Sequence, residues 1–228
     1  MKKKKKKKAV VLLSGGLDST TTLYDAKAKG YRVRALIFDY GQRHKKEVRQ
    51  AEKIARLARC EYRVIKLPFS WKGSALLDGK MSLPRGRNLK TISKKKIPST
   101  YVPARNIVFL SIAASVAESW GARKIFIGAN ARDYSGYPDC RPEFFRAFAA
   151  VLTRGTKSGV EHKAIKIETP LIHKTKEQII RMGRRLGVPY QLTWSCYRGG
   201  QRPCGTCDSC LLRQKGFAQL NLKDPVLT

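Results

Sequence analysis

The segment Ser14-Gly-Gly-Leu-Asp-Ser19 places two glycines, two hydroxyl groups and a carboxylate between an apolar run and a predicted helix. The backbone N–H groups of such a turn point toward one spot, and the dipole of the following helix favours negative charge there. Gly15 and Gly16 lack a Cβ atom, so a ligand can approach closely. The segment contains no lysine and matches neither the P-loop nor the dinucleotide-binding pattern. It predicts a phosphate or pyrophosphate site, with a tight turn of no chemical role as the alternative.

A second group of reactive side chains lies near the C-terminal end. Cys196, Cys204, Cys207 and Cys210 follow the spacing C-x7-C-x2-C-x2-C. Each C-x-x-C unit can offer two thiolates to one metal ion, and four thiolates complete a tetrahedron around zinc. An iron–sulfur centre has similar ligands and stays open, whereas a redox C-x-x-C is disfavoured because four cysteines share the segment. We expect a closed, structural Zn²⁺ site that fastens the C-terminal segment beside the active site.

The composition is that of a strongly basic globular chain. Its 228 residues are 42% hydrophobic, which allows one sizeable core and a small appendage. Lys and Arg number 48 against 16 Asp and Glu, for a net charge of +32. Because the charge is spread along the chain and the basic runs lack interleaved aromatic side chains, nucleic-acid binding is considered but not favoured.

The N-terminus does not resemble a targeting segment. Lys2 to Lys8 form an unbroken tract, and only five apolar residues follow it, which makes a poor signal peptide. No apolar stretch approaches the ~20 residues that span a bilayer. We therefore expect a cytoplasmic protein without membrane contact, in which six cysteines do not form a disulfide scaffold.

Strand and helix patterns alternate along the chain. Strands are predicted at 9–13, 31–38, 61–67, 124–128 and 165–172, and helices at 20–26, 44–58, 103–119, 142–153 and 175–186. This alternation is typical of an α/β fold with a doubly wound, mainly parallel five-stranded sheet, in which ligands bind at the carboxyl ends of strands. Polar segments follow three of the strands, at 14–19, 39–44 and 130–140.

Three parts of the chain are expected to differ in organisation. Residues 1–8 are predicted to be a disordered poly-lysine tail, 9–190 a nucleotide-binding α/β domain, and 191–228 a zinc-binding C-terminal segment. Residues 69–100 lack a clear period and indicate a long loop or flap, which in a compact domain is usually functional or disordered.

With these motifs in order, the chain resembles the 7-cyano-7-deazaguanine synthase (QueC) family of queuosine biosynthesis, in the PP-loop ATP pyrophosphatase superfamily. The resemblance extends from Ala9 to Leu222 and rests on SGGLDSTT (14–21), FDYGQRH (38–44), IPSTYVPARN (97–106), IGAN (127–130), DYSGYPDCRPEF (133–144), GTKSGVE (155–161), IETPL (167–171), TWSCY (193–197) and CGTCDSC (204–210). It implies an adenine nucleotide alpha hydrolase-like fold.

The resemblance also implies a ligase that forms C–N bonds. Such an enzyme converts 7-carboxy-7-deazaguanine, ammonia and ATP into the nitrile through an adenylated carboxylate and an adenylated amide. The PP-loop would stabilise the departing pyrophosphate in both rounds. We expect the ammonia to come from solution or from a partner, and the chain to form a homodimer.

The resemblance assigns the ATP site to the first loop and to residues that follow other strands. The loop residues are Leu13, Ser14, Gly15, Gly16, Leu17, Asp18, Ser19 and Thr20. Asp18 is expected to act through Mg²⁺ or through the helix start. Asp39, Gln42 and His44 are expected near the nucleotide or the reacting carboxylate. Arg105 is a candidate phosphate clamp because a guanidinium matches phosphate oxygens in a bidentate way, and Lys176 is a second clamp.

A further loop has the makings of a purine-like pocket. Carboxylates can pair with the N1–H and 2-amino edge of a guanine-type ring, and tyrosines can stack on it. The expected substrate residues are Asp133, Tyr134, Gly136, Tyr137, Asp139, Arg141 and Phe144. The chain departs from the family at His173, where an acidic residue is more common, and in its excess of lysine.

Three other functions compete with this interpretation. The first is a PP-loop enzyme that modifies tRNA, and the second is a QueC-like offshoot that attaches the deazaguanine to a protein. The third, of a different class, is a non-catalytic basic module that binds nucleotides or RNA. The intact Ser14–Ser19 loop and the purine-like loop favour the ligase.

Overall fold

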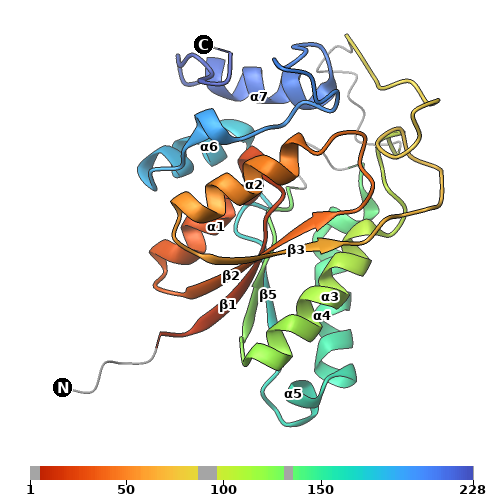
Figure 1. Ribbon diagram of the computed structural model, residues 1–228. Helices are drawn as coiled ribbons and strands as arrows, with labels where there is room; N and C mark the ends of the chain where they lie inside the picture. The colour runs from red at the N-terminus through yellow and green to blue at the C-terminus, as the bar shows by residue number, and fades with distance from the viewer. Residues whose placement is uncertain (1–5, 87–96, 131–135, 228) are drawn as a thin grey trace.

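The computed structural model describes residues 6–86, 97–130 and 136–227. Its centre is a parallel sheet of five strands in the order β3-β2-β1-β4-β5 (Figure 1). The strands are β1 (Lys8–Leu12), β2 (Arg32–Asp39), β3 (Glu61–Lys66), β4 (Lys124–Phe126) and β5 (Lys166–Glu168). The predicted doubly wound sheet is therefore confirmed, and its strand order reverses beside β1, where such folds bind ligands.

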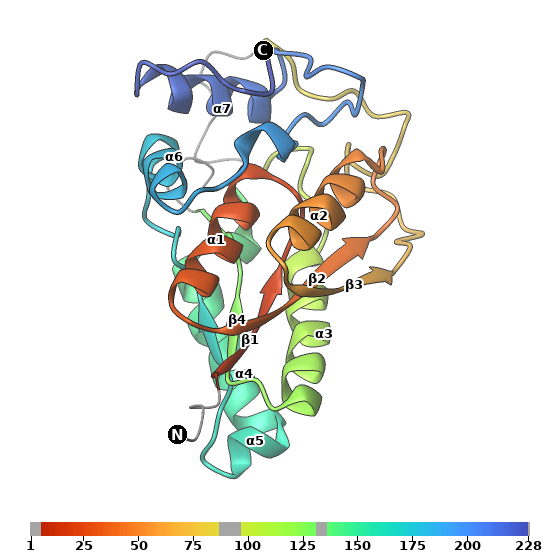
Figure 2. The ribbon, with the colours of Figure 1, turned by 60° about the vertical axis from the view of Figure 1, so that its left-hand side comes forward.

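Both faces of the sheet are covered by helices (Figures 1 and 2). Val10 and Leu12 of β1 pack on the side of α3 (Arg105–Trp120) and α4 (Pro142–Gly155). Ala9 and Val11 pack on the side of α1 (Leu17–Ala28) and α2 (Lys46–Leu57). Because β1 is buried on both sides, its sequence is an unbroken apolar run rather than an alternating one.

A third layer forms above the carboxyl ends of the strands. It consists of α6 (Lys176–Arg185) and α7 (Asp208–Ala218), which pack on α1 through a cluster that includes Leu17, Ile180 and Phe217. A capping box starts α6, in which Thr175 accepts from the N–H of Gln178 and the Gln178 side chain accepts from the N–H of Thr175. Short helices complete the described chain at α5 (Lys157–Val160), η1 (Pro138–Cys140) and η2 (Tyr190–Leu192).

Several boundaries differ from the prediction. Helix α7 was not predicted, because its buried side includes Asp208, Arg213 and Gly216 and so does not read as an apolar stripe. Strand β5 ends at Glu168 instead of continuing to residue 172, since the next residues form turns. Helix α3 begins at Arg105, because residue 104 adopts a left-handed conformation with φ of 55°.

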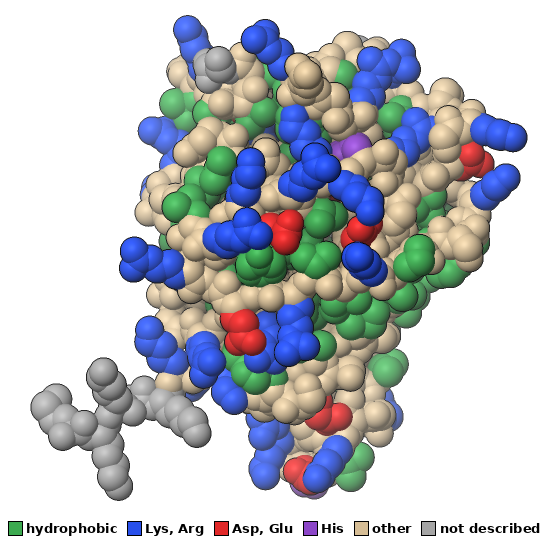
Figure 3. All heavy atoms as spheres, viewed as in Figure 1, with side chains coloured by type: hydrophobic (Ala, Val, Ile, Leu, Met, Phe, Trp, Pro, Cys, Tyr) green, Lys and Arg blue, Asp and Glu red, His purple; other side chains and the backbone are tan. Residues whose placement is uncertain are grey.

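The surface carries the excess of positive charge over many elements. Figure 3 shows Lys and Arg side chains distributed over the whole of one face, with a few acidic side chains between them. None of the helices in the described ranges is both long and apolar enough to cross a membrane.

Candidate active site

A cavity of about 310 Å³ opens at the carboxyl ends of β1, β2 and β4. Its walls come from segments that are distant in sequence: the loop after β1, the chain after β2 with the first turn of α2, Leu76, the start of α3, the chain after β4, the start of α6 and the C-terminal segment. The polar lining residues include Ser14, Asp18, Ser19, Gln42, Arg43, His44, Glu47, Arg105, Asn106, Asn130, Tyr137, Lys176, Ser195 and Arg213. The sequence-predicted ATP residues Leu13, Gly16 and Leu17 line it as well.

The loop after β1 is closed by its own hydrogen bonds. The hydroxyl groups of Ser14 and Ser19 lie 2.9 Å apart, and the Ser14 N–H donates to Ser19 Oγ at 3.1 Å. The hydroxyl of Thr20, which is buried, donates to the carbonyl oxygen of Gly16 at 2.8 Å. Gly16 is the N-cap of α1 and offers no capping side chain, so the first N–H groups of α1 have no such partner. They can therefore donate to an oxyanion in the cavity.

Position 15 requires glycine for two reasons, its backbone conformation and the close approach of α2. Its φ is +81°, and a Cβ atom there would lie 2.4 Å from the carbonyl oxygen of Glu47. The first turn of α2 is thus in direct contact with the loop. Neither the left-handed conformation nor this close approach leaves room for a side chain.

Two of the predicted site residues, Asp18 and Lys176, form an ion pair. The Lys176 Nζ lies 2.8 Å from both carboxylate oxygens of Asp18, and both side chains are largely buried. Lys176 is the first residue of α6, so the pair joins the start of α1 to the start of α6. This arrangement places a cation and a carboxylate side by side on the cavity wall.

The chain after β2 places its polar residues differently. Gln42 holds the turn, since its Oε1 accepts from the Tyr40 N–H at 2.8 Å and its Nε2 donates to the Phe38 carbonyl at 3.3 Å. Asp39 is paired with Lys45 at 3.0 Å and does not line the cavity. His44 does line it, and burial lowers the pKa of this imidazole, which keeps it neutral at neutral pH.

Arg105 reaches the cavity from the start of α3. Its Nη1 donates to the Tyr40 hydroxyl at 3.4 Å, and its guanidinium carbon lies 5.8 Å from the centre of the Tyr40 ring. Burial opposes its charge, but the interactions with Tyr40, Cys140 and Asp139 outweigh that effect and raise the pKa of Arg105 above its usual value. The cavity therefore holds a partly desolvated cation beside Tyr40.

Glu47 is a lining residue that the sequence reasoning missed. It lies in the first turn of α2, three residues after His44, and both residues line the cavity. Burial raises the pKa of Glu47 to about 7, although the nearby Arg105 lowers it in part. Its position one turn after the FDYGQRH motif was the signal that could have identified it.

The predicted purine loop is only partly brought to the cavity. Tyr137 lines it, and its hydroxyl lies 2.7 Å from Thr100 Oγ1. Gly136 is buried, and Asp133 and Tyr134 lie outside the described residues. Cys140 also lines the cavity, and burial raises the pKa of its thiol to about 12, so that it stays neutral.

The remaining members of that loop have structural partners. Asp139 is buried and accepts a hydrogen bond of 3.0 Å from the N–H of Asn106, in the first turn of α3. Arg141 is exposed, and the ring of Phe144 packs against Phe145 and Phe148 at centroid distances of 5.1 and 5.9 Å. None of the three lines the cavity within the described chain.

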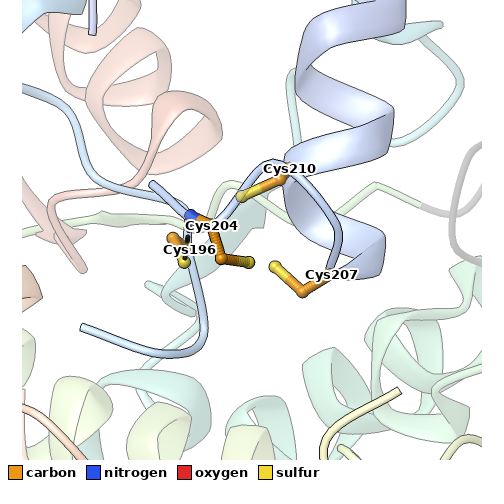
Figure 4. Close-up of side chains that lie close together, drawn as sticks. All are labelled: Cys196, Cys204, Cys207 and Cys210. Atoms are coloured by element: carbon orange, nitrogen blue, oxygen red, sulfur yellow. Dashed lines mark hydrogen bonds between the residues drawn. The ribbon is translucent and has the colours of Figure 1, made fainter. Parts of the chain in front are cut away.

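The four cysteines converge, as predicted (Figure 4). Their sulfur atoms all lie within 4.8 Å of one another, and a tetrahedral zinc with Zn–S bonds of about 2.3 Å needs S–S separations of about 3.8 Å. Hydrogen bonds within the cluster lower the pKa of Cys196 and raise the pKa of Cys207 and Cys210, so Cys196 ionises before these two thiols. Residues 85 and 86 also pair with this segment, through a bridge to Cys207 and a hydrogen bond to the Thr206 carbonyl. The cluster can therefore bind a metal ion with four protein ligands.

Comparisons with known proteins agree with this geometry. The family model described as "Queuosine biosynthesis protein QueC" matches residues 8–221. The 7-cyano-7-deazaguanine synthase of Thermoplasma acidophilum is 53% identical over 211 residues, which cover 92% of this chain and 87% of that protein. The enzyme of the same name from Thermosynechococcus vestitus is 54% identical over 213 residues, covering 92% and 91%.

Among solved structures, an NMN synthetase from Francisella tularensis shares the fold, with a TM-score of 0.51 at 15% identity over 96% of this chain and 79% of that one. The Ser14–Ser19 loop on a cavity at the strand ends and the adjoining cysteine cluster thus occur in a chain that one family model matches over residues 8–221. The chain belongs to the QueC family of queuosine biosynthesis proteins.

Proposed function

We propose that this protein is a 7-cyano-7-deazaguanine synthase, an ATP-dependent ligase that converts 7-carboxy-7-deazaguanine and ammonia into the nitrile. The observation that carries the proposal is the Ser14–Ser19 loop on the wall of a cavity of about 310 Å³, in a chain 53% identical to a protein of that name. The lining supplies oxyanion donors in the Ser14–Ser19 loop and an aromatic ring, Tyr137.

The chemistry explains why ATP is used twice. A carboxylate is a poor electrophile, so its oxygen first attacks the α-phosphorus of ATP, which releases pyrophosphate and forms an acyl adenylate. Ammonia then displaces AMP and leaves an amide. In the second round the amide oxygen is adenylated, and loss of AMP leaves the C≡N bond. The uncapped N–H groups of α1 and the hydroxyls of Ser14 and Ser19 are placed to stabilise the departing pyrophosphate.

We assign the cationic side chains of the cavity to the phosphates. Arg105 is the clamp with a planar, bidentate head, and Lys176 is the clamp on the side of α6. Lys176 binds Asp18 in the structure, so an arriving triphosphate offers the lysine a second anionic partner. Such an exchange leaves the Asp18 carboxylate able to take part in cation binding.

The residues present also fit the two expected metal ions. Mg²⁺ is usually held by one or two carboxylates together with substrate phosphates, and Asp18 is the carboxylate beside the loop. Mg²⁺ would neutralise phosphate charge there. Cys196, Cys204, Cys207 and Cys210 fit Zn²⁺ in a closed site, which would supply structural support and no open coordination position.

One assay tests this function. Purified protein is incubated with ATP, Mg²⁺, ammonium and 7-carboxy-7-deazaguanine, and AMP and the nitrile are measured by mass spectrometry. We expect two AMP per nitrile, and loss of both products in Ser14→Ala and Asp18→Ala. Ser111→Ala, on an exposed side of α3, is the matched control and should retain full activity. Absence of the nitrile with the wild-type chain would refute the proposal, and full activity of Ser14→Ala would refute the assignment of the loop.

The expected homodimer, the supply of ammonia from solution or a partner, and the cytoplasmic location remain predictions. Multi-angle light scattering of the full chain measures the first directly. A mass of twice 25.7 kDa supports a homodimer, and a mass of 25.7 kDa contradicts it.

A further inference from the structure

Glu47 differs from the other acidic side chain of the cavity. Within the described ranges, Asp18 and Glu47 are the acids on the cavity wall, and Asp18 is paired with Lys176. The carboxylate of Glu47 has no hydrogen bond or ion pair to any described residue. Glu47 is half-buried and lines the cavity, and no hydrogen bond within the described chain accounts for its carboxylate there.

The structure holds Glu47 beside the phosphate loop. Its carbonyl oxygen is the atom that a Cβ at Gly15 would meet at 2.4 Å, so the first turn of α2 lies directly against the loop. On the other side, the Nζ of Lys46 donates to the carbonyls of Gly200 and Gln201 at 2.9 and 2.6 Å. The start of α2 is thus fixed between the loop and the cysteine-bearing segment.

The proposed reaction requires a base in this cavity. In the first round a C–N bond forms, the C–O bond to AMP breaks, and the nitrogen of ammonia must lose one proton. In the second round the amide oxygen forms a bond to the α-phosphorus and pyrophosphate leaves. The same nitrogen then loses two protons as the C–O bond to AMP breaks and the C≡N bond forms. Three protons must therefore leave the substrate nitrogen for each nitrile made.

We propose that Glu47 is the catalytic base that takes these protons from the substrate nitrogen. The proposal depends on the synthase function above and adds a residue to it. The carboxylate accepts a proton from the ammonium centre of the tetrahedral adduct in the first round and from the imidate nitrogen in the second, and returns each to solvent.

The surroundings of Glu47 suit that task. The charge of Glu47 interacts with Arg105 of α3, with Cys196 of the C-terminal segment and with Tyr40 of the chain after β2. Burial raises the pKa of Glu47 to about 7, and the positive charge of Arg105 offsets part of this effect. A base whose pKa lies near the working pH combines a useful ionised fraction with a strong pull on the proton.

The test separates adenylation from proton transfer in the full-length, metal-loaded enzyme. Adenylation is followed by isotope exchange between ATP and pyrophosphate that depends on 7-carboxy-7-deazaguanine, and the later steps by mass spectrometry of amide and nitrile. For Glu47→Gln we expect exchange within about threefold of wild type and amide formation reduced by about 10²–10³-fold. Glu52→Gln, on the same helix and paired with Arg56, is the control with wild-type rates in both assays.

A pH profile gives a second measurement. At constant free ammonia, the wild-type rate of amide formation should rise through about pH 7, and Glu47→Gln should lack this limb. Wild-type amide formation by Glu47→Gln, or an equal loss of exchange and amide formation, overturns the proposal. If Glu47→Gln does not fold, Glu47→Asp decides the matter, because it keeps a carboxylate and should retain exchange while amide formation falls by about tenfold or more. A wild-type enzyme that makes amide and nitrile separates these outcomes from failure of the synthase function itself.

Discussion

The backbone N–H of Trp194 donates a hydrogen bond of 2.9 Å to the carbonyl oxygen of Gly15, which joins the cysteine-bearing segment directly to the phosphate loop. The indole N–H of the same residue donates to the Cys196 carbonyl at 2.9 Å, and the Lys46 Nζ lies 3.6 Å from the centre of the indole ring. Trp194 therefore connects the cysteine cluster, the loop and the start of α2. The cluster supports the active site through this residue.

Removal of the metal should weaken ATP binding. Loss of metal frees four cysteines that lie in a loop and at the start of α7, so residues 193–210 should unfold locally and release Gly15. We expect affinity for ATP to fall by about tenfold or more after chelation, with faster hydrogen exchange confined to this segment. Calorimetric titration before and after chelation, with Zn²⁺ added back as the control, measures the effect. An unchanged affinity in metal-free protein would contradict the coupling.

Gly15→Ala should disrupt the loop. The substitution places an alanine at a positive φ of +81°, with its Cβ atom 2.4 Å from the carbonyl oxygen of Glu47. This oxygen belongs to the backbone of α2, so it cannot shift without displacing the helix. We expect the free energy of unfolding to fall by more than ~2 kcal/mol, and ATP binding to be lost. Gly79→Ala is the control, since a Cβ there meets nothing within 4 Å and its change should stay within ~0.5 kcal/mol. Denaturant titrations of both variants give the comparison, and equal effects would show that the contact is unimportant.

The pair of Arg213 and Asp224 should be essential for the C-terminal segment. Both side chains are about 5% exposed, with Nε to Oδ2 at 2.7 Å, and Arg213 also donates to Thr193 Oγ1 at 2.7 Å and to the Tyr190 carbonyl at 3.1 Å. Asp224→Ala leaves a buried guanidinium without its anion, so we expect a loss of ~3–5 kcal/mol in unfolding experiments.

The control variant for Asp224→Ala removes an ion pair on the surface of the protein. Glu161→Gln removes an exposed ion pair with Lys157 at 3.8 Å and should cost under ~1 kcal/mol. Similar losses for the two variants would mean that Asp224 is not a structural partner of the kind described.

The stability of the protein should depend on the ionisation of Glu47. Its pKa of about 7 lies above the ordinary value of 4.5, so the folded state binds this proton more tightly than the unfolded chain does. The contribution of Glu47 to the free energy of unfolding therefore decreases as the pH rises from 4.5 to about 7. Glu47→Gln should raise the melting temperature by about 5 °C or more at about pH 8, and by much less at about pH 5. A uniform shift at both pH values would contradict the raised pKa.

The features that could be predicted from the sequence are those whose residues lie within one short segment. The β1 strand, the Ser14–Ser19 loop and the cysteine ligands are each written in a short segment, and the structure brings them together as expected. Glu47 could not be identified in this way, because its importance comes from the approach of α2 to Gly15.

The purine loop could not be interpreted from its own segment alone. From that segment, Asp139 was expected to bind the substrate. The structure shows that its carboxylate instead binds the first turn of α3, at the N–H of Asn106. The partner lies on another element, so the chain near Asp139 gives no sign of it. Helix α7 was missed because its buried residues mix Asp208, Cys210, Arg213 and Gly216 with Phe217, so the sequence shows no apolar stripe there.

The most direct test of the account follows the oxygen atoms of the substrate. 7-Carboxy-7-deazaguanine labelled with ¹⁸O in both carboxylate positions is converted with unlabelled ATP, and the AMP is analysed by mass spectrometry. Each carboxylate oxygen becomes bonded to the α-phosphorus of an ATP molecule and then departs from the carbon as part of AMP. We therefore predict one ¹⁸O atom in each of two AMP molecules per nitrile. Unlabelled AMP, or ADP and phosphate in its place, would contradict the central claim that this cavity adenylates first the carboxylate and then the amide.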